Sequence, residues 1–142
     1  MTLTRDRRTE LLAAAPLLSG VDAAGLERIA DRTVEVAFTD GHVIARQGEV
    51  GTGFFMIASG ATRVVRDGET IATLGQGDFF GELSVLDGQP RLAQVIAEGE
   101  TVCLALATWD LEAVINEQPS VALALLRGLA GRLRTLTEAG QH

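Results

Sequence analysis

The sequence predicts a mainly β domain, an antiparallel sandwich or barrel that carries helices at both ends. Between residues 34 and 107, short apolar runs rich in Val, Ile, Phe and Thr alternate with glycine-containing turns, a spacing typical of such a sheet. Apolar residues recur at helical spacing before and after this region. With 142 residues, 46% of them hydrophobic, the chain is expected to form a single domain, 1–142, around one core.

The first 33 residues are expected to form two short helices. Leucine and alanine recur at helical spacing up to Pro16, which interrupts the pattern. Asp22 then stands where its carboxylate can cap a second helix. Residues 1–33 are therefore assigned to an N-terminal helical segment.

Residues 34–107 are expected to hold the strands. The pair Asp67 and Gly68 predicts a two-residue hairpin, because a type I′ turn needs a positive φ at both central positions. Alternating apolar runs predict strands at 34–38, 43–46, 54–58, 61–66, 70–74, 92–97 and 102–107.

Residues 108–142 return to a helical pattern. Thr108 is expected to cap a helix that runs to Asn116, and Pro119 is expected to start a last helix that ends near Glu138. The apolar residues of this last helix step by four and three, as in a coiled-coil seam: Ala122, Leu126, Leu129, Leu133 and Leu136. The same pattern also suits a helix that lies on its own barrel.

Charge and composition exclude several classes of function. Residues 35–118 carry four arginines and thirteen acidic residues, a net charge of −9 within a chain of −7, which argues against a nucleic-acid-binding surface. Cys103 is the only cysteine and the chain has two histidines, so no metal site is expected. No apolar run reaches the roughly 18 residues of a membrane span, and the N-terminus lacks a signal-peptide core. A cytoplasmic protein without membrane association is expected.

The segment 77–95 carries the residues best suited to bind an anion. Gly81 permits a close backbone approach, and a helical turn over 83–86 would leave its first N–H groups unpaired. Arg91 adds a guanidinium fork that binds phosphate, while Glu82 can accept from a pair of hydroxyls such as a ribose edge. From these residues alone, an ion pair of Arg91 with Asp87 or Glu82 is an equal alternative.

Residues 80–95 read Phe-Gly-Glu-Leu-Ser-Val-Leu-Asp-Gly-Gln-Pro-Arg-Leu-Ala-Gln-Val. This segment resembles the phosphate-binding cassette of cyclic nucleotide-binding domains, which occur in bacterial cyclic-AMP receptor proteins, protein kinase A regulatory subunits and cyclic nucleotide-gated channels. The family pattern runs Phe-Gly-Glu-Leu-Ala-Leu and then Pro-Arg-Ala-Ala, without a gap relative to this chain. The resemblance implies a jelly-roll-like antiparallel β-roll, or double-stranded β-helix, with N-terminal helices and C-terminal B and C helices.

The resemblance also implies a role for each matching residue. Glu82 would accept from the ribose 2′-hydroxyl, Gly81 would allow the approach, and Arg91 would hold the cyclic phosphate together with the backbone of Leu83 and Ser84. Leu92 and Ala93 complete the expected ligand-binding group. A base and ribose pocket is expected from Val64, Ile71, Leu74, Thr135, Leu136 and Thr137. For the first three, a position in the ordinary core is the favoured alternative.

Two residues depart from the family pattern. Leu92 stands where the family has a small or hydroxylic residue, so a hydrogen bond to phosphate or guanine is lost. Gln94 stands where Thr, Ser or an aromatic residue is usual. One neutral hydrogen bond is worth about 0.5–1.5 kcal/mol, so binding is expected to be weakened rather than abolished, with cyclic AMP favoured over cyclic GMP.

The sequence therefore predicts a regulatory sensor without catalysis or cofactor, whose ligand is cyclic AMP or, second, cyclic GMP. Binding is expected to move the C-terminal helices. The alternative is a degenerate domain that serves dimerisation or partner docking without nucleotide, through the leucine seam of the last helix. Nothing follows His142, so no DNA-binding function is expected of these residues.

Overall fold

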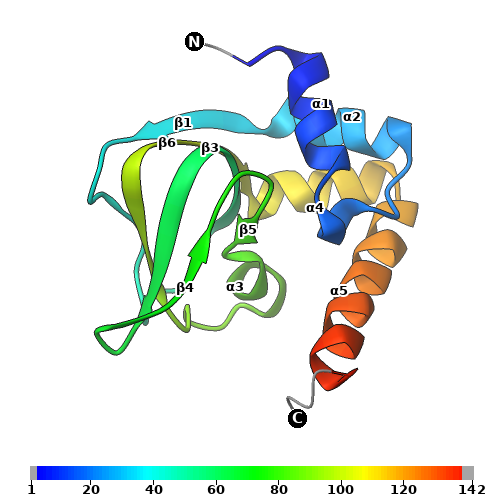
Figure 1. Cartoon of the computed structure of the whole chain (residues 1–142). Coiled ribbons are helices and arrows are strands. Elements are labelled where there is room, and N and C mark those ends of the chain that lie inside the picture. Colours follow the sequence, from blue (N-terminus) through cyan, green and yellow to red (C-terminus); the bar gives the residue numbers. More distant parts are fainter. Residues whose placement is uncertain (1–2, 139–142) are drawn as a thin grey trace.

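The computed structural model describes residues 3–138, with the backbone alone at positions 83 and 85. Its strands curl into an antiparallel roll on one side of the molecule, and most of the helices gather on the other (Figure 1). The predicted class, an antiparallel β-roll with flanking helices, is confirmed. The strands are β1 (Val34–Phe38), β2 (Val43–Ala45), β3 (Gly53–Arg66), β4 (Glu69–Leu74), β5 (Phe79–Phe80) and β6 (Gln94–Ala107).

The long strands β3 and β6 form the spine of the roll. Their order in the sheet is β1-β6-β3-β4, with β2 added to β6 and β5 added to β3, and every pairing is antiparallel. The hairpin between β3 and β4 turns at Asp67 and Gly68, whose φ angles of 51° and 81° confirm the predicted turn.

The sequence predicted two separate strands where β3 runs and two more where β6 runs, and this prediction was wrong because each is one continuous strand. The register of β3 against β6 shifts between Ile57 and Ala61, and Gly60 takes a φ of 90° at this bend. A bulge of this kind bends a strand without ending it. The sequence also missed β5, which has two residues, and placed the start of β6 two residues early, at Leu92.

The helical elements are α1 (Arg5–Ala13), the 3-10 helix η1 (Pro16–Leu18), α2 (Ala23–Arg32), α3 (Glu82–Asp87), α4 (Thr108–Glu117) and α5 (Ser120–Glu138). Asp22 caps α2, as predicted, by accepting from the amide of Gly25 at 2.8 Å. The prediction that Thr108 caps α4 was wrong by one residue, because the N-cap is Ala107 and Thr108 is the first helical residue.

Two clusters of buried residues form the core. The larger joins α1, η1, α2, α4 and the first half of α5 to the ends of β3 and β6. The smaller fills the inside of the roll with Ala45, Ile57, Phe80, Val95 and Cys103. Cys103 is fully buried, and burial raises the pKa of its thiol to about 12.

The buried contacts of helix α5 lie in its first half. Val121, Ala124 and Leu125 are buried, and Gly128 lies against the backbone of Leu17 in η1. From residue 130 to 138 every residue is exposed. This half of α5 runs down beside the roll toward the level of α3 (Figure 1).

Candidate functional site

The expected cassette forms one short helix between β5 and β6. Gly81 caps the start of α3 with a φ of 87°, and Gly88 ends the helix with a φ of 69°. Phe80 anchors the cassette to the roll, since it is 5% exposed and its ring stacks on Phe55 at 5.1 Å between centroids. The backbone N–H groups of the first turn have no helical acceptor and remain able to bind an anion.

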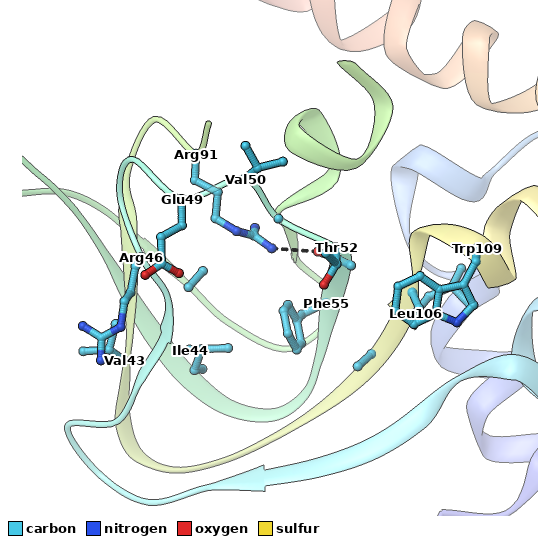
Figure 2. A pocket seen from close by; sticks show the side chains of 15 residues that line it. Val43, Ile44, Arg46, Glu49, Val50, Thr52, Phe55, Arg91, Leu106 and Trp109 are labelled. Atoms are coloured by element: carbon cyan, nitrogen blue, oxygen red, sulfur yellow. Dashed lines mark hydrogen bonds between the residues drawn. The ribbon is translucent and has the colours of Figure 1, made fainter. Parts of the chain in front are cut away.

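Arg91 lies inside the molecule rather than in bulk water. Its guanidinium fits between Gly51 and Gly81 and donates from Nη2 to the carbonyl of Gly53 at 2.8 Å (Figure 2). Burial lowers the pKa of Arg91, an effect that the nearby charges of Glu49 and Glu82 oppose. A half-buried guanidinium with unused donors is suited to an anionic ligand.

Glu82 contributes a buried carboxylate on the same side of the cassette. The residue is 7% exposed, and its Oε1 accepts from Nη1 of Arg132 in α5 at 2.8 Å. Its Oε2 is buried and has no hydrogen-bond partner among the described residues. A buried oxygen of this kind is costly to leave unpaired, so it is ready to accept from a ligand hydroxyl.

Gly81, Glu82 and Arg91 all line one cavity of about 280 Å³. Leu92 is 62% exposed at its edge and does not plug it. The cavity brings together eight of the predicted site residues: Val64, Leu74, Gly81, Glu82, Ser84, Arg91, Leu92 and Ala93. For Leu83, the predicted role concerns only the backbone, which lies in the first turn of α3.

Two of the three predicted residues of the last helix lie on a second cavity. This cavity, of about 700 Å³, lies between α5, the segment 16–20 that contains η1, and the turn after β4. Both Thr135 and Leu136 line it. Leu74 and Phe79 line both cavities, so the two adjoin.

Two predicted residues line neither of these cavities. Ile71 is 57% exposed on β4. Thr137 is exposed and donates its hydroxyl to the carbonyl of Leu133 within α5.

A third cavity, of about 370 Å³, lies on the other side of Arg91 (Figure 2). Its far end is bordered by Trp109, at the start of α4. Trp109 is 64% exposed, so most of its side chain is not packed against the roll. Arg91 thus stands between two cavities.

Sequence reasoning missed three residues of the site. Arg132 pairs with Glu82 from 50 residues away, and Gly53 binds Arg91 from 38 residues away. Gly51 was not predicted to belong to the site, although it borders the Arg91 guanidinium. The one available signal was that Arg132 precedes Thr135 by about one helical turn, which places it on the same face of α5.

Within residues 3–138, no group of three or more His, Cys, Asp or Glu side chains could hold a metal ion. In the same part of the chain, no helix combines the length and the apolar character that crossing a membrane requires.

A β-roll that directs a half-buried arginine, a buried glutamate and free helix amides into one cavity has the architecture of a domain that binds a small anionic ligand. The family model described as Cyclic nucleotide-binding domain matches residues 35–118, and the chain belongs to this family.

Named relatives agree with this assignment. The chain is 37% identical over 100 residues to the cAMP-dependent protein kinase regulatory subunit of Blastocladiella emersonii, covering 67% of this chain and 25% of that protein. It is 33% identical over 130 residues to the CRP-like cAMP-activated global transcriptional regulator of Mycobacterium tuberculosis, covering 88% of this chain and 58% of the relative. The chain thus spans a quarter to three fifths of these relatives.

A solved structure shares the fold over almost its full length. The N-terminal domain of a transcriptional regulator from Streptomyces coelicolor A3(2) superposes with a TM-score of 0.80 at 32% identity, covering 91% of this chain and 93% of that one.

Proposed function

We propose that the chain is a regulatory module that binds cyclic AMP in preference to cyclic GMP and carries no catalysis of its own, with residues 1–142 acting as one domain. A single observation carries the proposal: Arg91 and Glu82 line the same cavity of about 280 Å³, and Oε2 of Glu82 has no hydrogen-bond partner among the described residues. A cyclic nucleotide offers an anionic phosphate to the first and a ribose hydroxyl to the second. The names of the relatives in kinases and transcription regulators support cyclic AMP as the ligand.

In this proposal each part of the ligand has its own set of contacts. Arg91 and the backbone amides of Leu83 and Ser84 hold the cyclic phosphate. Oε2 of Glu82 accepts from the 2′-hydroxyl, which satisfies an oxygen that otherwise has no partner. Val64 and Leu74 pack against the ribose and the base.

The exposed half of α5, whose Arg132 is bonded to Glu82 of the cassette, supplies the regulated movement. Thr135 and Leu136 line the larger cavity that adjoins the ligand site, so a small shift of α5 toward the roll would bring them to the base. Since Val121, Ala124 and Leu125 anchor the first half of α5 while residues 130–138 are exposed, ligand binding would favour a closed position of the second half.

Isothermal titration with cyclic AMP and cyclic GMP tests the proposal directly. Wild type is expected to bind cyclic AMP more tightly, because Leu92 has no hydroxyl to offer guanine. Leu92→Thr is expected to raise the affinity for cyclic GMP by about twofold to tenfold, the value of one neutral hydrogen bond. Leu123→Thr replaces another exposed leucine that borders none of the three cavities and serves as the control. No heat with either nucleotide would rule the proposal out.

The role of Glu82 can be isolated with a ligand that lacks the 2′-hydroxyl. We expect 2′-deoxy cyclic AMP to bind wild type about tenfold more weakly than cyclic AMP, because the buried Oε2 stays unpaired. In Glu82→Gln this preference for the hydroxyl should shrink. A preference that is unchanged in the variant would place the hydroxyl elsewhere in the site.

A second candidate function, homodimerisation through α5 with or without nucleotide, is favoured by the exposure of its leucines. Leu126, Leu133 and Leu136 are 62%, 66% and 49% exposed, and the spacing of these residues places them on one face. Only Leu129 of this seam packs partly against the core. Exposed leucines in a row are typical of a surface that a partner covers.

Sedimentation velocity distinguishes this candidate. Leu126→Gln combined with Leu133→Gln is expected to convert a dimer to a monomer. Arg134→Gln changes an exposed residue of the same helix that is not part of the leucine seam, and it should leave the dimer intact. A wild-type monomer at millimolar concentration, with or without nucleotide, would exclude the seam as an interface.

A further inference from the structure

The loop between β2 and β3 is fastened to the segment that carries Arg91. The amide of Gly48 donates to the carbonyl of Arg91 at 2.9 Å, and the amide of Arg91 donates to the carbonyl of Glu49 at 2.8 Å. Beyond these bonds, Val50 forms an isolated β-bridge with Pro90. The loop and the backbone of Arg91 therefore form one unit.

The hydroxyl of Ser84 ties the same loop to the cassette helix. Ser84 is 6% exposed, and its Oγ accepts from the amide of Gly51 at 2.8 Å while donating to the carbonyl of Gln89 at 2.6 Å. One hydroxyl thus joins the loop, helix α3 and the segment before Arg91. This bond fixes where Gly51 lies relative to the site.

Glycine is required at position 51 by space rather than by backbone conformation. Gly51 does not belong to the glycines with positive φ, so an alanine could adopt its backbone angles. A Cβ at this position, however, would meet the Arg91 guanidinium, with Nε 2.7 Å away and both Cζ and Nη2 nearer still. The absent side chain leaves the slot that the guanidinium occupies.

We propose that Gly51 is a positioning residue for Arg91, held in place by the hydroxyl of Ser84, and that together they set where the guanidinium meets the ligand phosphate. This inference rests on the proposed function, because the ligand phosphate is the group that Arg91 binds. Gly51 acts through Arg91 and need not touch the ligand itself.

The identity of the crowded atoms determines what a substitution at position 51 does. All three nearest atoms belong to the far end of one flexible side chain, so the guanidinium moves and the backbone does not. Once displaced, Arg91 loses its 2.8 Å bond to the carbonyl of Gly53 and its aim into the cavity. The fold should therefore survive Gly51→Ala while the phosphate contact is lost.

Titration calorimetry with cyclic AMP measures this effect. Gly51→Ala is expected to weaken binding about tenfold or more, the value of a misplaced charge-assisted hydrogen bond. Ser84→Ala should weaken it about threefold, because Gly51 loses the hydroxyl that holds it in place. Gly75→Ala is the matched control, since Gly75 also has an ordinary φ but open space around its Cβ, and should stay within about twofold of wild type.

A second measurement separates positioning from a general loss of structure. In the free protein, the Nε–Hε signal of Arg91 in a nitrogen-proton NMR spectrum should shift in Gly51→Ala, while the backbone amides of the roll keep their positions. Gly51→Ala should also cost little further affinity in an Arg91→Lys background, because the fork that it positions is gone.

The outcomes distinguish this inference from the proposed function. Absence of cyclic AMP binding in wild type would overturn the proposed function, and the Arg91 signal would still show whether Gly51 places the guanidinium. Wild-type affinity in Gly51→Ala, an unchanged Arg91 signal, or an equal loss in the Arg91→Lys background would each overturn the positioning role.

Discussion

Replacing Arg91 by alanine is expected to weaken cyclic AMP binding by about a hundredfold or more, measured by isothermal titration. The phosphate would lose two charge-assisted hydrogen bonds of roughly 1.5–3 kcal/mol each, in a cavity where no other arginine is available to replace them. Since the central region is strongly acidic, no general attraction for an anion would compensate.

Two further variants sharpen this prediction. Arg91→Lys retains the charge without the planar fork and should recover only part of the affinity. Arg63→Ala removes a partly exposed arginine of β3 that borders none of the three cavities, and its affinity should equal that of wild type. Equal affinity in Arg91→Ala and wild type would remove Arg91 from the site.

Replacing Gly60 by alanine is expected to lower the free energy of unfolding by about 3 kcal/mol, measured by urea denaturation. Gly60 has a φ of 90°, and a Cβ there would meet the carbonyl oxygen of Glu100 and approach the Cα of Thr101 to 2.9 Å. These atoms belong to the backbone of β6, which cannot move aside as a side chain can.

Gly41→Ala provides the matched control for the bend at Gly60. Gly41 also has a positive φ, of 80°, but no atom lies within 4 Å of its Cβ position. Gly41→Ala should therefore lower the free energy of unfolding only by the backbone strain, about 1–2 kcal/mol. An equal loss in both variants would show that the contact with β6 contributes nothing.

Local sequence features predicted the fold well where the cause of the structure was local. The hairpin at Asp67 and Gly68 and the cap at Asp22 depend on residues a few positions apart, and both were predicted. The bend at Gly60 was misread as a strand end, because a glycine in an apolar run gives the same pattern for a turn and for a bulge. Only the partner strand decides between them.

The same reasoning explains which parts of the site were predicted. Gly81, Glu82 and Arg91 lie within one segment of eleven residues, so the pattern of that segment was enough to identify them as candidates. The groups that surround them come from the start of β3 and from α5, where Gly53 and Arg132 make contacts that no local sequence pattern indicates. The candidate binding residues could therefore be predicted from one contiguous segment, whereas the residues that hold them in place could not.

The single thiol of the chain has a practical consequence for following α5. Cys103 sits fully buried in β6 and its pKa is about 12, so almost none of it is thiolate at neutral pH. Maleimide reagents, which attack thiolates, should therefore leave the native side chain unlabelled. A fluorophore coupled to a cysteine introduced at the exposed position 137 would test the proposed movement of α5 without any other change to the sequence.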